Sequence, residues 1–250
     1  MNDQQAITAM FDGIAPRYDL LNRLLSFHLD TRWRKKTSRM VKEHLSEILG
    51  ASSHQTAPTA ILDVATGTAD LALQLSKDNP EAQVTGIDLS LPMLEIGNDK
   101  IQRQRLEHQV HLQAADAQHL PFPDHSFDAV TCAFGVRNFE ALEVGLQEMR
   151  RVTKDNGIIA ILEFSMPTSW WIRAPYQGYT RYLLPLIGRM ISGHKDAYTY
   201  LPESIKTFST QSLTDRLLDI GFPEVHTTHL CGGVATIYIA NLKKNGSALQ

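Results

Sequence analysis

Three aspartates near the ends of short apolar runs could together hold a nucleoside. Asp63 precedes a turn of small residues, Ala65-Thr66-Gly67-Thr68-Ala69, after which an amphipathic helix begins. Such a strand–turn–helix directs backbone N–H groups and a helix N-terminus at a ligand. Asp88 ends the next apolar run, where a carboxylate can bind ribose hydroxyls, and Asp116 follows the third run. Because the carboxyl ends of parallel strands meet at one sheet edge, the three acids predict a crevice site there.

The turn departs from the common phosphate-binding and dinucleotide-binding patterns. It does not match G-x-G-x-x-G, and the Gly-Lys-Ser/Thr of Walker-type loops is absent. Aligned with the methyltransferase pattern D-x-G-x-G-x-G, it keeps only Gly67, while Ala65 and Ala69 occupy the other two positions. Alanine is small enough for a close backbone approach if its φ stays negative. The alternatives are a packing turn without a ligand and, for Asp116, a turn or cap aspartate.

The elements that must position these residues alternate between strands and helices. Strands are expected at 60–65, 83–88, 109–114, 127–133 and 157–163, and helices at 69–78, 91–106 and 140–153, the last closed by Asn156-Gly157. This alternation is typical of βαβ units on a parallel sheet. A helix at 210–220 and strands at 223–230 and 234–241, joined at Gly232-Gly233, predict a terminal antiparallel hairpin. A parallel sheet finished in this way favours a class I methyltransferase over a dehydrogenase, with other doubly wound folds as the alternative.

Two further segments flank this core. Residues 3–48 are predicted to be helical with one break near Ala15-Pro16, and residues 50–58 form a polar linker. Residues 166–205 interrupt the alternation and are rich in tryptophan and tyrosine. We therefore expect a single domain over residues 1–250. Its parts are an N-terminal helical extension (1–50), a cofactor-binding core (59–165), a substrate cap (166–205) and a terminal helix and hairpin (206–242).

Composition excludes several classes of protein. Of the 250 residues, 43% are hydrophobic and 20% are charged, which supports a sizeable core. The net charge of −3 gives no global basic excess for binding nucleic acid. Only two cysteines, Cys132 and Cys231, argue against a disulfide scaffold and fit a reducing cytoplasm. A secretory signal and an apolar run long enough to span a bilayer are both missing, so a cytoplasmic protein is expected.

Several ordered motifs make a family resemblance specific. Leu120-Pro121-Phe122-Pro123-Asp124-His125-Ser126-Phe127-Asp128 resembles the loop after the adenine-binding acid in S-adenosylmethionine-dependent methyltransferases. Phe134-Gly135-Val136-Arg137-Asn138 resembles the F-G-[LV]-R-N of the ubiquinone/menaquinone biosynthesis C-methyltransferases. Further segments similar to that family are Met10 to Asp19 with Leu21-Asn22, Leu162-Glu163-Phe164-Ser165, Tyr198 to Ile205 and Gly232-Gly233-Val234-Ala235. The resemblance covers nearly the whole chain.

The resemblance implies an S-adenosylmethionine site on a class I fold. That fold has a Rossmann-like seven-stranded sheet with the last strand antiparallel, N-terminal helices and an α-helical cap insertion. Carried over by motif, Asp63, Gly67 and Thr68 form the turn, with Thr68 facing the methionine moiety, and Asp88 holds the ribose. Asp116 and the Ala117 N–H hold adenine, where many relatives have Asn at position 116. Ala133 stands where many relatives have Ser, so that side-chain hydrogen bond is absent here.

The resemblance also implies a substrate, a polyprenylated hydroquinone methylated on a ring carbon. Only the reduced ring has the electron density to attack a sulfonium methyl, and no metal is needed. Asp196 or Tyr200 is the candidate base, and Arg137 the candidate stabiliser of a phenolate. His28 and His194 are further candidates for which a structural role is favoured.

The sequence Tyr200-Leu201-Pro202-Glu203 and the absence of the early glycines of the turn favour methylation of demethylmenaquinol to menaquinol. The alternatives are an enzyme that also methylates a ubiquinol precursor, and a methyltransferase for another small molecule or for nucleic acid. Cys132 lies in a predicted apolar strand and is interpreted as a buried hydrophobe, which disfavours cytosine methylation. A homodimer is a compatible assembly.

A lipid substrate suggests contact with a membrane surface. Residues 169–192 mix tryptophans, aliphatic residues and arginines, as interfacial segments do. Arg32-Trp33-Arg34-Lys35-Lys36, with Arg39, could contact anionic lipid. The alternatives are a buried cap helix and a solvated helix face. A transient contact with the inner face of the membrane is therefore expected.

Overall fold

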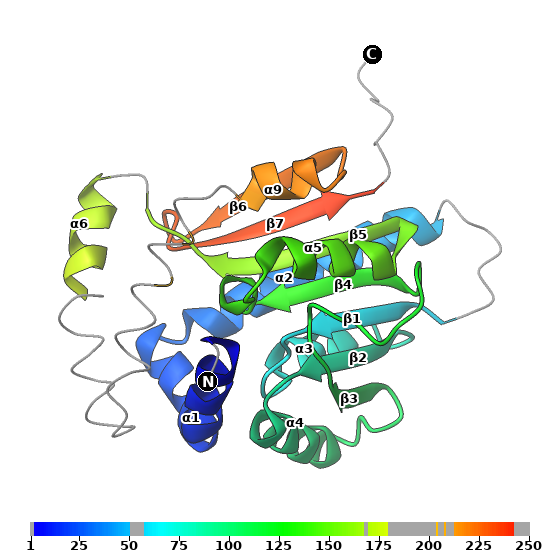
Figure 1. The fold of residues 1–250 in the computed structure, drawn as a ribbon, viewed down its shortest axis with the longest axis horizontal. Coiled ribbons are helices and arrows are strands. Elements are labelled where there is room, and N and C mark those ends of the chain that lie inside the picture. The colour runs from blue at the N-terminus through cyan, green and yellow to red at the C-terminus, as the bar shows by residue number, and fades with distance from the viewer. Residues whose placement is uncertain are drawn as a thin grey trace.

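The computed structural model describes residues 3–50, 58–167, 170–179, 204, 208 and 213–242. A seven-stranded sheet forms its centre, in the order β3-β2-β1-β4-β5-β7-β6 (Figure 1). The strands are β1 (Ala60–Val64), β2 (Gln83–Asp88), β3 (Val110–Ala114), β4 (Phe127–Ala133), β5 (Thr153–Phe164), β6 (Glu224–Leu230) and β7 (Ala235–Asn241). All neighbours are parallel except β7, which is antiparallel to both β5 and β6. The expected class I sheet, including the terminal hairpin, is confirmed.

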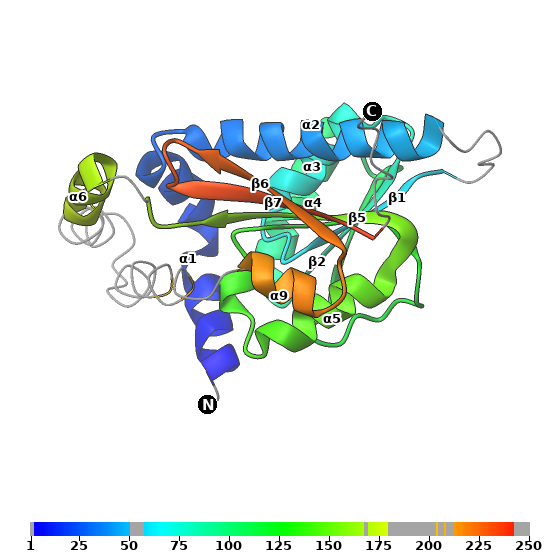
Figure 2. The same ribbon diagram turned by 90° about the horizontal axis from the view of Figure 1, so that it is seen from above.

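Helices cover both faces of the sheet (Figure 2). The helices are α1 (Asp3–Leu25), α2 (Leu29–Gly50), α3 (Asp70–Asp78), α4 (Leu91–Gln104), α5 (Leu142–Val152), α6 (Trp170–Gly178) and α9 (Leu213–Asp219). Successive side chains of a strand point to opposite faces, so β1 sends Ile61 into one core and Leu62 into the other. The first core is closed by α2 and α3, and the second by α5 and α9.

The strand order reverses between β1 and β4, which flank each other although β2 and β3 lie between them in the chain. Crossovers from β1 go one way along the sheet, and those from β4 go the other. The loops at the carboxyl ends of these strands therefore separate and leave a crevice, which is where open α/β sheets bind ligands.

The N-terminal helical region is interrupted at a different place from the one expected. Helix α1 runs through Pro16 without ending, and the chain breaks instead at Phe27 and His28, whose φ angles are 54° and 61°. Proline removes only one helix N–H group, and Pro16 lies on the exposed side of α1. Packing of the buried face of α1, with Ile14 and Leu21, outweighs that loss.

Gly157 does not cap a helix, contrary to expectation. Helix α5 ends at Val152 and passes directly into β5, in which Gly157 lies. A Cβ at Gly157 would lie 2.9 Å from the Asp128 carbonyl oxygen, beside the register shift between Phe127 and Ala129. Glycine is therefore needed for a close strand–strand approach. The predicted linker 50–58 lies almost entirely outside the described residues.

No helix in the described part of the chain combines the length and the apolar character needed to cross a bilayer.

Candidate active site

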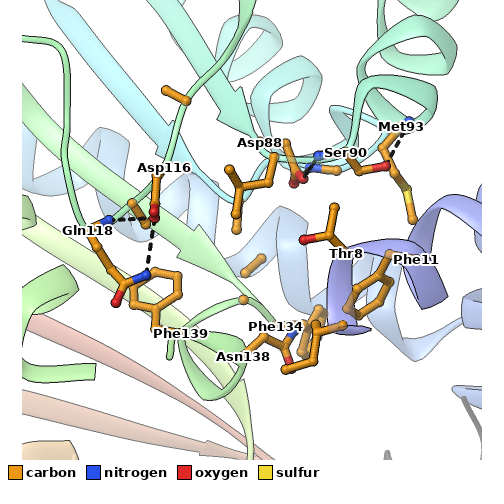
Figure 3. A pocket seen from close by; sticks show the side chains of 18 of the residues that line it. Thr8, Phe11, Asp88, Ser90, Met93, Asp116, Gln118, Phe134, Asn138 and Phe139 are labelled. Carbon is orange, nitrogen blue, oxygen red and sulfur yellow. Dashed lines mark hydrogen bonds between the residues drawn. The ribbon is translucent and has the colours of Figure 1, made fainter. Parts of the chain in front are cut away.

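A cavity lies at the carboxyl ends of β1, β2, β3 and β4, where the strand order reverses (Figure 3). The loops that follow these strands form its floor, and α1 forms its roof. Its lining includes five of the residues expected to bind cofactor, which are Gly67, Asp88, Asp116, Ala117 and Ala133. Residues far apart in the sequence therefore meet around one space.

The Asp88 carboxylate is fixed at the end of β2. Its Oδ1 accepts from the Ser90 N–H at 2.9 Å, and its Oδ2 accepts from the Gly67 N–H at 2.8 Å. Burial raises the pKa of Asp88, and these N–H groups oppose the rise, while Asp12 adds to it. Each oxygen keeps acceptor capacity, so the carboxylate can also accept from two vicinal hydroxyl groups.

Gly67 brings the backbone of the β1–α3 turn to the cavity. Its φ is +56°, and a Cβ built there meets only the Tyr18 ring, at 3.9 Å. A side chain would therefore fill the cavity, and glycine leaves that space for a ligand. Ala65 and Ala69 also have positive φ, 53° and 63°, so the negative φ that would let alanine fit without strain is not present. Non-glycine residues in this region are strained, and the tight turn imposes that strain on both alanines.

Asp63 and Thr68 belong to the same turn but do not line the cavity. Asp63 is 1% exposed and accepts hydrogen bonds from Thr66 Oγ1 and Thr131 Oγ1, both at 2.7 Å. Thr68 Oγ1 donates to Asp19 at 2.6 Å and accepts from Lys100 Nζ at 2.9 Å. Asp63 thus ties the turn to β4, and Thr68 ties it to α1 and α4.

Asp116 lies across the cavity from Asp88 (Figure 3), and Ala117, the next residue, also lines the cavity. The Oδ1 atom of Asp116 accepts from the N–H of Gln118 at 2.9 Å, as a turn aspartate does. Oδ1 also accepts from the side-chain amide of Gln118 at 3.4 Å, so among the described residues both hydrogen bonds of this carboxylate go to Oδ1. Asp116 therefore has a structural role in its turn and still offers Oδ2 to a ligand.

Arg137 is buried next to the cavity. It lies in the short 3-10 helix Val136–Asn138, and its Nη1 donates to Glu163 Oε1 and to the Phe134 carbonyl oxygen, both at 2.6 Å. The side chain is only 6% exposed, and its Cζ lies 5.3 Å from the centre of the Phe164 ring. Its Nε is buried without a hydrogen-bond partner among the described residues. A buried N–H group left in this way is costly unless a ligand oxygen accepts from it.

Two tyrosines lie in the electrostatic field of Arg137. Burial raises the pKa of Tyr18, and it raises the pKa of Tyr176 to about 12, while Arg137 opposes both shifts. Both phenols are therefore neutral near pH 7 and act as hydrogen-bonding groups.

The roof of the cavity was not expected from the sequence. Ile7, Thr8, Phe11 and Tyr18 of α1 line it, although the predicted cofactor residues all came from the core. Phe11 and Tyr18 are seven residues apart, which puts both on one face of α1. They lie in the segment Met10 to Asp19, whose sequence resembles a motif of the family without indicating a cofactor contact.

The other expected catalytic groups fall elsewhere. Asp196, Tyr200 and His194 lie outside the described residues. His28 is exposed in the turn between α1 and α2. Cys132 is fully buried in β4, and burial raises the pKa of its thiol well above the usual value, as expected for a structural cysteine. Among the described residues, no three metal-ligating side chains gather in one place.

These features fit S-adenosylmethionine. The paired acceptors of Asp88 suit a ribose, the Asp116 edge suits an adenine amino group, and the open space above Gly67 suits a ligand that follows the turn. The cavity lacks the Gly-rich phosphate cradle that a dinucleotide needs.

Comparisons with known proteins agree with this geometry. The sequence profile of the ubiE/COQ5 methyltransferase family matches residues 1–242. A demethylmenaquinone methyltransferase of Porphyromonas gingivalis is 42% identical over 94% of this chain and 92% of its own length. Another, from Thermus thermophilus, is 44% identical over 93% of this chain and 99% of its own length.

A solved structure gives the same fold. A SAM-dependent methyltransferase of Thermotoga maritima matches with a TM-score of 0.58 and 18% identity, covering 94% of this chain and 99% of that one.

Proposed function

The chain belongs to the ubiE/COQ5 methyltransferase family, and we propose that it transfers a methyl group from S-adenosylmethionine to a ring carbon of demethylmenaquinol, giving menaquinol. The observation that carries the proposal is identity above 40% with relatives of that activity over more than 90% of both chains. The cavity built around Asp88, Gly67 and Asp116 supports it independently, because it suits the methyl donor.

S-adenosylmethionine supplies an electrophilic methyl group on its sulfonium. Asp88 would bind the ribose hydroxyls, Asp116 and the Ala117 N–H the adenine, and the backbone at Gly67 the methionine end. Helix α1 excludes water from this side by placing Phe11 and Tyr18 over the cavity. Thr68 acts through Asp19 by fixing the turn to that roof.

We propose that Arg137 binds the ring hydroxyl of the substrate and stabilises it as a phenolate. The unpartnered Nε of Arg137 and its burial beside the cavity support this role. A buried cation lowers the free energy of an adjacent oxyanion far more than an exposed one does. The resulting electron density on the ring carbon is what an attack on a sulfonium methyl requires.

Forming this phenolate releases the proton of the ring hydroxyl, and a base of the chain must accept it. Burial raises the pKa of Tyr176 to about 12, so its phenol stays protonated near pH 7 and cannot accept a proton. Glu163 is fully buried and already accepts from Arg137 and from the Phe164 N–H. We propose Asp196 or Tyr200 as the base. Full turnover and unchanged cofactor affinity in both Asp196→Asn and Tyr200→Phe would rule this out.

Direct assay tests the function. Purified protein with S-adenosylmethionine and chemically reduced demethylmenaquinol should yield menaquinol, and the oxidised quinone should yield nothing. Cells lacking the protein should accumulate demethylmenaquinone, whereas unchanged quinones would contradict the proposal. A second assay with a ubiquinol precursor tests dual specificity, because some similar proteins are named for both ubiquinone and menaquinone biosynthesis.

The same assay tests Arg137. Arg137→Lys keeps the charge but removes Nε, so turnover should fall by roughly 100-fold while affinity for S-adenosylmethionine stays the same. Arg103→Lys, on an exposed side chain of α4, is the matched control. Equal turnover in the two variants would remove Arg137 from the mechanism.

The substrate of this reaction carries a long polyprenyl tail. We propose that the protein meets it by transient contact with the membrane surface. A homodimer is also proposed, to be tested by the mass of the protein in solution.

A further inference from the structure

Exposed apolar side chains gather at one corner of the molecule. The described residues include nine large hydrophobic side chains with high exposure, and five of these are Leu20, Leu24, Phe27, Trp170 and Trp171, at 43% to 80%. Leu20 and Leu24 are one helical turn apart on α1, and Phe27 follows in the turn that leads to α2. Burial in water-free surroundings would be favourable for all five.

Helix α6 is attached to this corner. The Tyr179 hydroxyl, just after α6, donates to the Leu25 carbonyl oxygen at 2.6 Å, and its ring centre lies 6.0 Å from that of Phe27. Both ribbon views place α6 at the edge of the molecule, beyond the end of the sheet where α1 meets α2 (Figures 1 and 2). The two exposed tryptophans belong to α6 and therefore lie at the same corner.

A basic face begins immediately beside the apolar residues. Arg32, Lys35, Lys36 and Arg39 are exposed on α2 and line a shallow groove together with Met40 and Glu43. The other half of the expected basic cluster points inward, because Trp33 and Arg34 are only 4% and 7% exposed. The whole chain has a net charge of −3, so this concentration of cations is local.

We propose that this corner, formed by Leu20, Leu24, Phe27, Trp170 and Trp171 with the cations of α2, docks on an anionic lipid bilayer. Tryptophan and leucine side chains enter the interfacial region, while lysine and arginine contact the headgroups. The inference rests on the proposed function, since a polyprenylated quinol resides in the bilayer.

The position of the corner suits delivery of such a substrate. Helix α1 presents Leu20 and Leu24 to the outside and Phe11 and Tyr18 to the cavity. One helix therefore separates the docked surface from the cofactor. A second copy of this chain fits the corner poorly, because a symmetric contact would bring two sets of cations together.

Vesicle co-sedimentation tests the surface. The probes are vesicles of phosphatidylcholine alone and of phosphatidylcholine with about one third phosphatidylglycerol. The wild-type protein should bind the anionic vesicles and release them at high salt. The double variants Lys35→Glu/Lys36→Glu and Leu20→Gln/Leu24→Gln should each lose roughly tenfold or more of this binding. Arg103→Glu/Arg105→Glu reverses two charges at the end of α4 and should bind as the wild type does.

Turnover of a tail-less, water-soluble demethylmenaquinol analogue separates this proposal from the proposed function. All variants should methylate it like the wild type without vesicles, and the two corner variants should lose turnover only on long-tailed substrate in vesicles. The docking surface would be overturned if both corner variants bound anionic vesicles as the wild type does, or if the wild type did not bind them. It would also be overturned if the corner variants changed the mass of the protein in solution, because the corner would then be a contact between copies of the chain. If the protein bound anionic vesicles as expected but methylated no naphthoquinol, the docking surface would be supported and the proposed function would be refuted.

Discussion

The carboxyl group of Asp63 is a structural tie that also titrates. It is buried under the β1–α3 turn and is held by the hydroxyls of Thr66 and Thr131. Burial raises its pKa to about 6, although both hydroxyls oppose the rise. The native state therefore binds this proton more tightly than the unfolded chain does. Its contribution to stability is complete below pH 3.8, the ordinary pKa, and is lost as the pH rises through about 6.

Asp63→Asn should remove this pH dependence. A pKa change from 3.8 to about 6 corresponds to roughly 3 kcal/mol, so the wild type should lose up to about that much relative to the variant between pH 4 and pH 7.5. Urea unfolding across that range measures the difference. Asp99→Asn, on an exposed side chain of α4, is the control and should leave the profile unchanged. A constant difference between wild type and Asp63→Asn would mean that Asp63 is ionised throughout.

At the scale of elements, the β1–α3 turn holds strain that a single substitution can release. Ala65 has φ +53° and is half-buried, so Ala65→Gly removes the left-handed penalty and little buried area. We expect the free energy of unfolding to rise by about 0.5–1 kcal/mol, the left-handed penalty less the entropy cost of glycine. Ala72→Gly, in the buried interior of α3, should instead lower it by about 1 kcal/mol or more. Chemical denaturation compares the two, and a loss of stability in both would show that the turn is not strained.

The sequence predicted elements well where local pattern decides and badly where packing decides. Strand β2 has the predicted bounds, because its apolar run ends at Asp88. Pro16 predicted a break that α1 does not have, since the buried face of the helix compensates for one missing hydrogen bond. The local sequence at Gly157 predicts a helix cap, whereas the glycine is required by the Asp128 carbonyl of the neighbouring strand β4.

The same distinction applies to the site. Gly67, Asp88 and Asp116 follow strands, so their meeting at one edge follows from the parallel sheet. The contributions of Thr8, Phe11 and Tyr18 depend on how α1 docks across the strand ends, and no local pattern encodes that docking. The partners of Thr68 were missed for the same reason, since Asp19 and Lys100 come from two distant helices.

At the scale of the whole molecule, a half-buried ionic clamp joins the roof to the core. Lys100 Nζ on α4 lies 2.5 Å from Asp19 of α1 and 2.6 Å from Asp70 of α3. Burial alone would raise the pKa of Asp70, but Arg34 and Lys100 outweigh it and hold the pKa below its ordinary value. A second tie joins α1 to the N-cap of α4, where Ser90 Oγ donates to Asp12 at 2.5 Å. These contacts hold α1 over the cavity, and we expect the ligand to leave when they open.

Lys100→Met should therefore speed the release of S-adenosylmethionine. Without the ammonium group, the carboxylates of Asp19 and Asp70 remain close together and partly buried, and their repulsion pushes α1 away from the turn. Stopped-flow displacement should give a dissociation rate about tenfold higher, and limited proteolysis should cut α1 sooner. Lys77→Met, on an exposed side chain of α3, should change neither. If Lys100→Met unfolds the protein, Asp19→Asn weakens the same clamp without leaving two negative charges facing each other. An unchanged dissociation rate in a folded clamp variant would show that the ligand leaves without movement of α1.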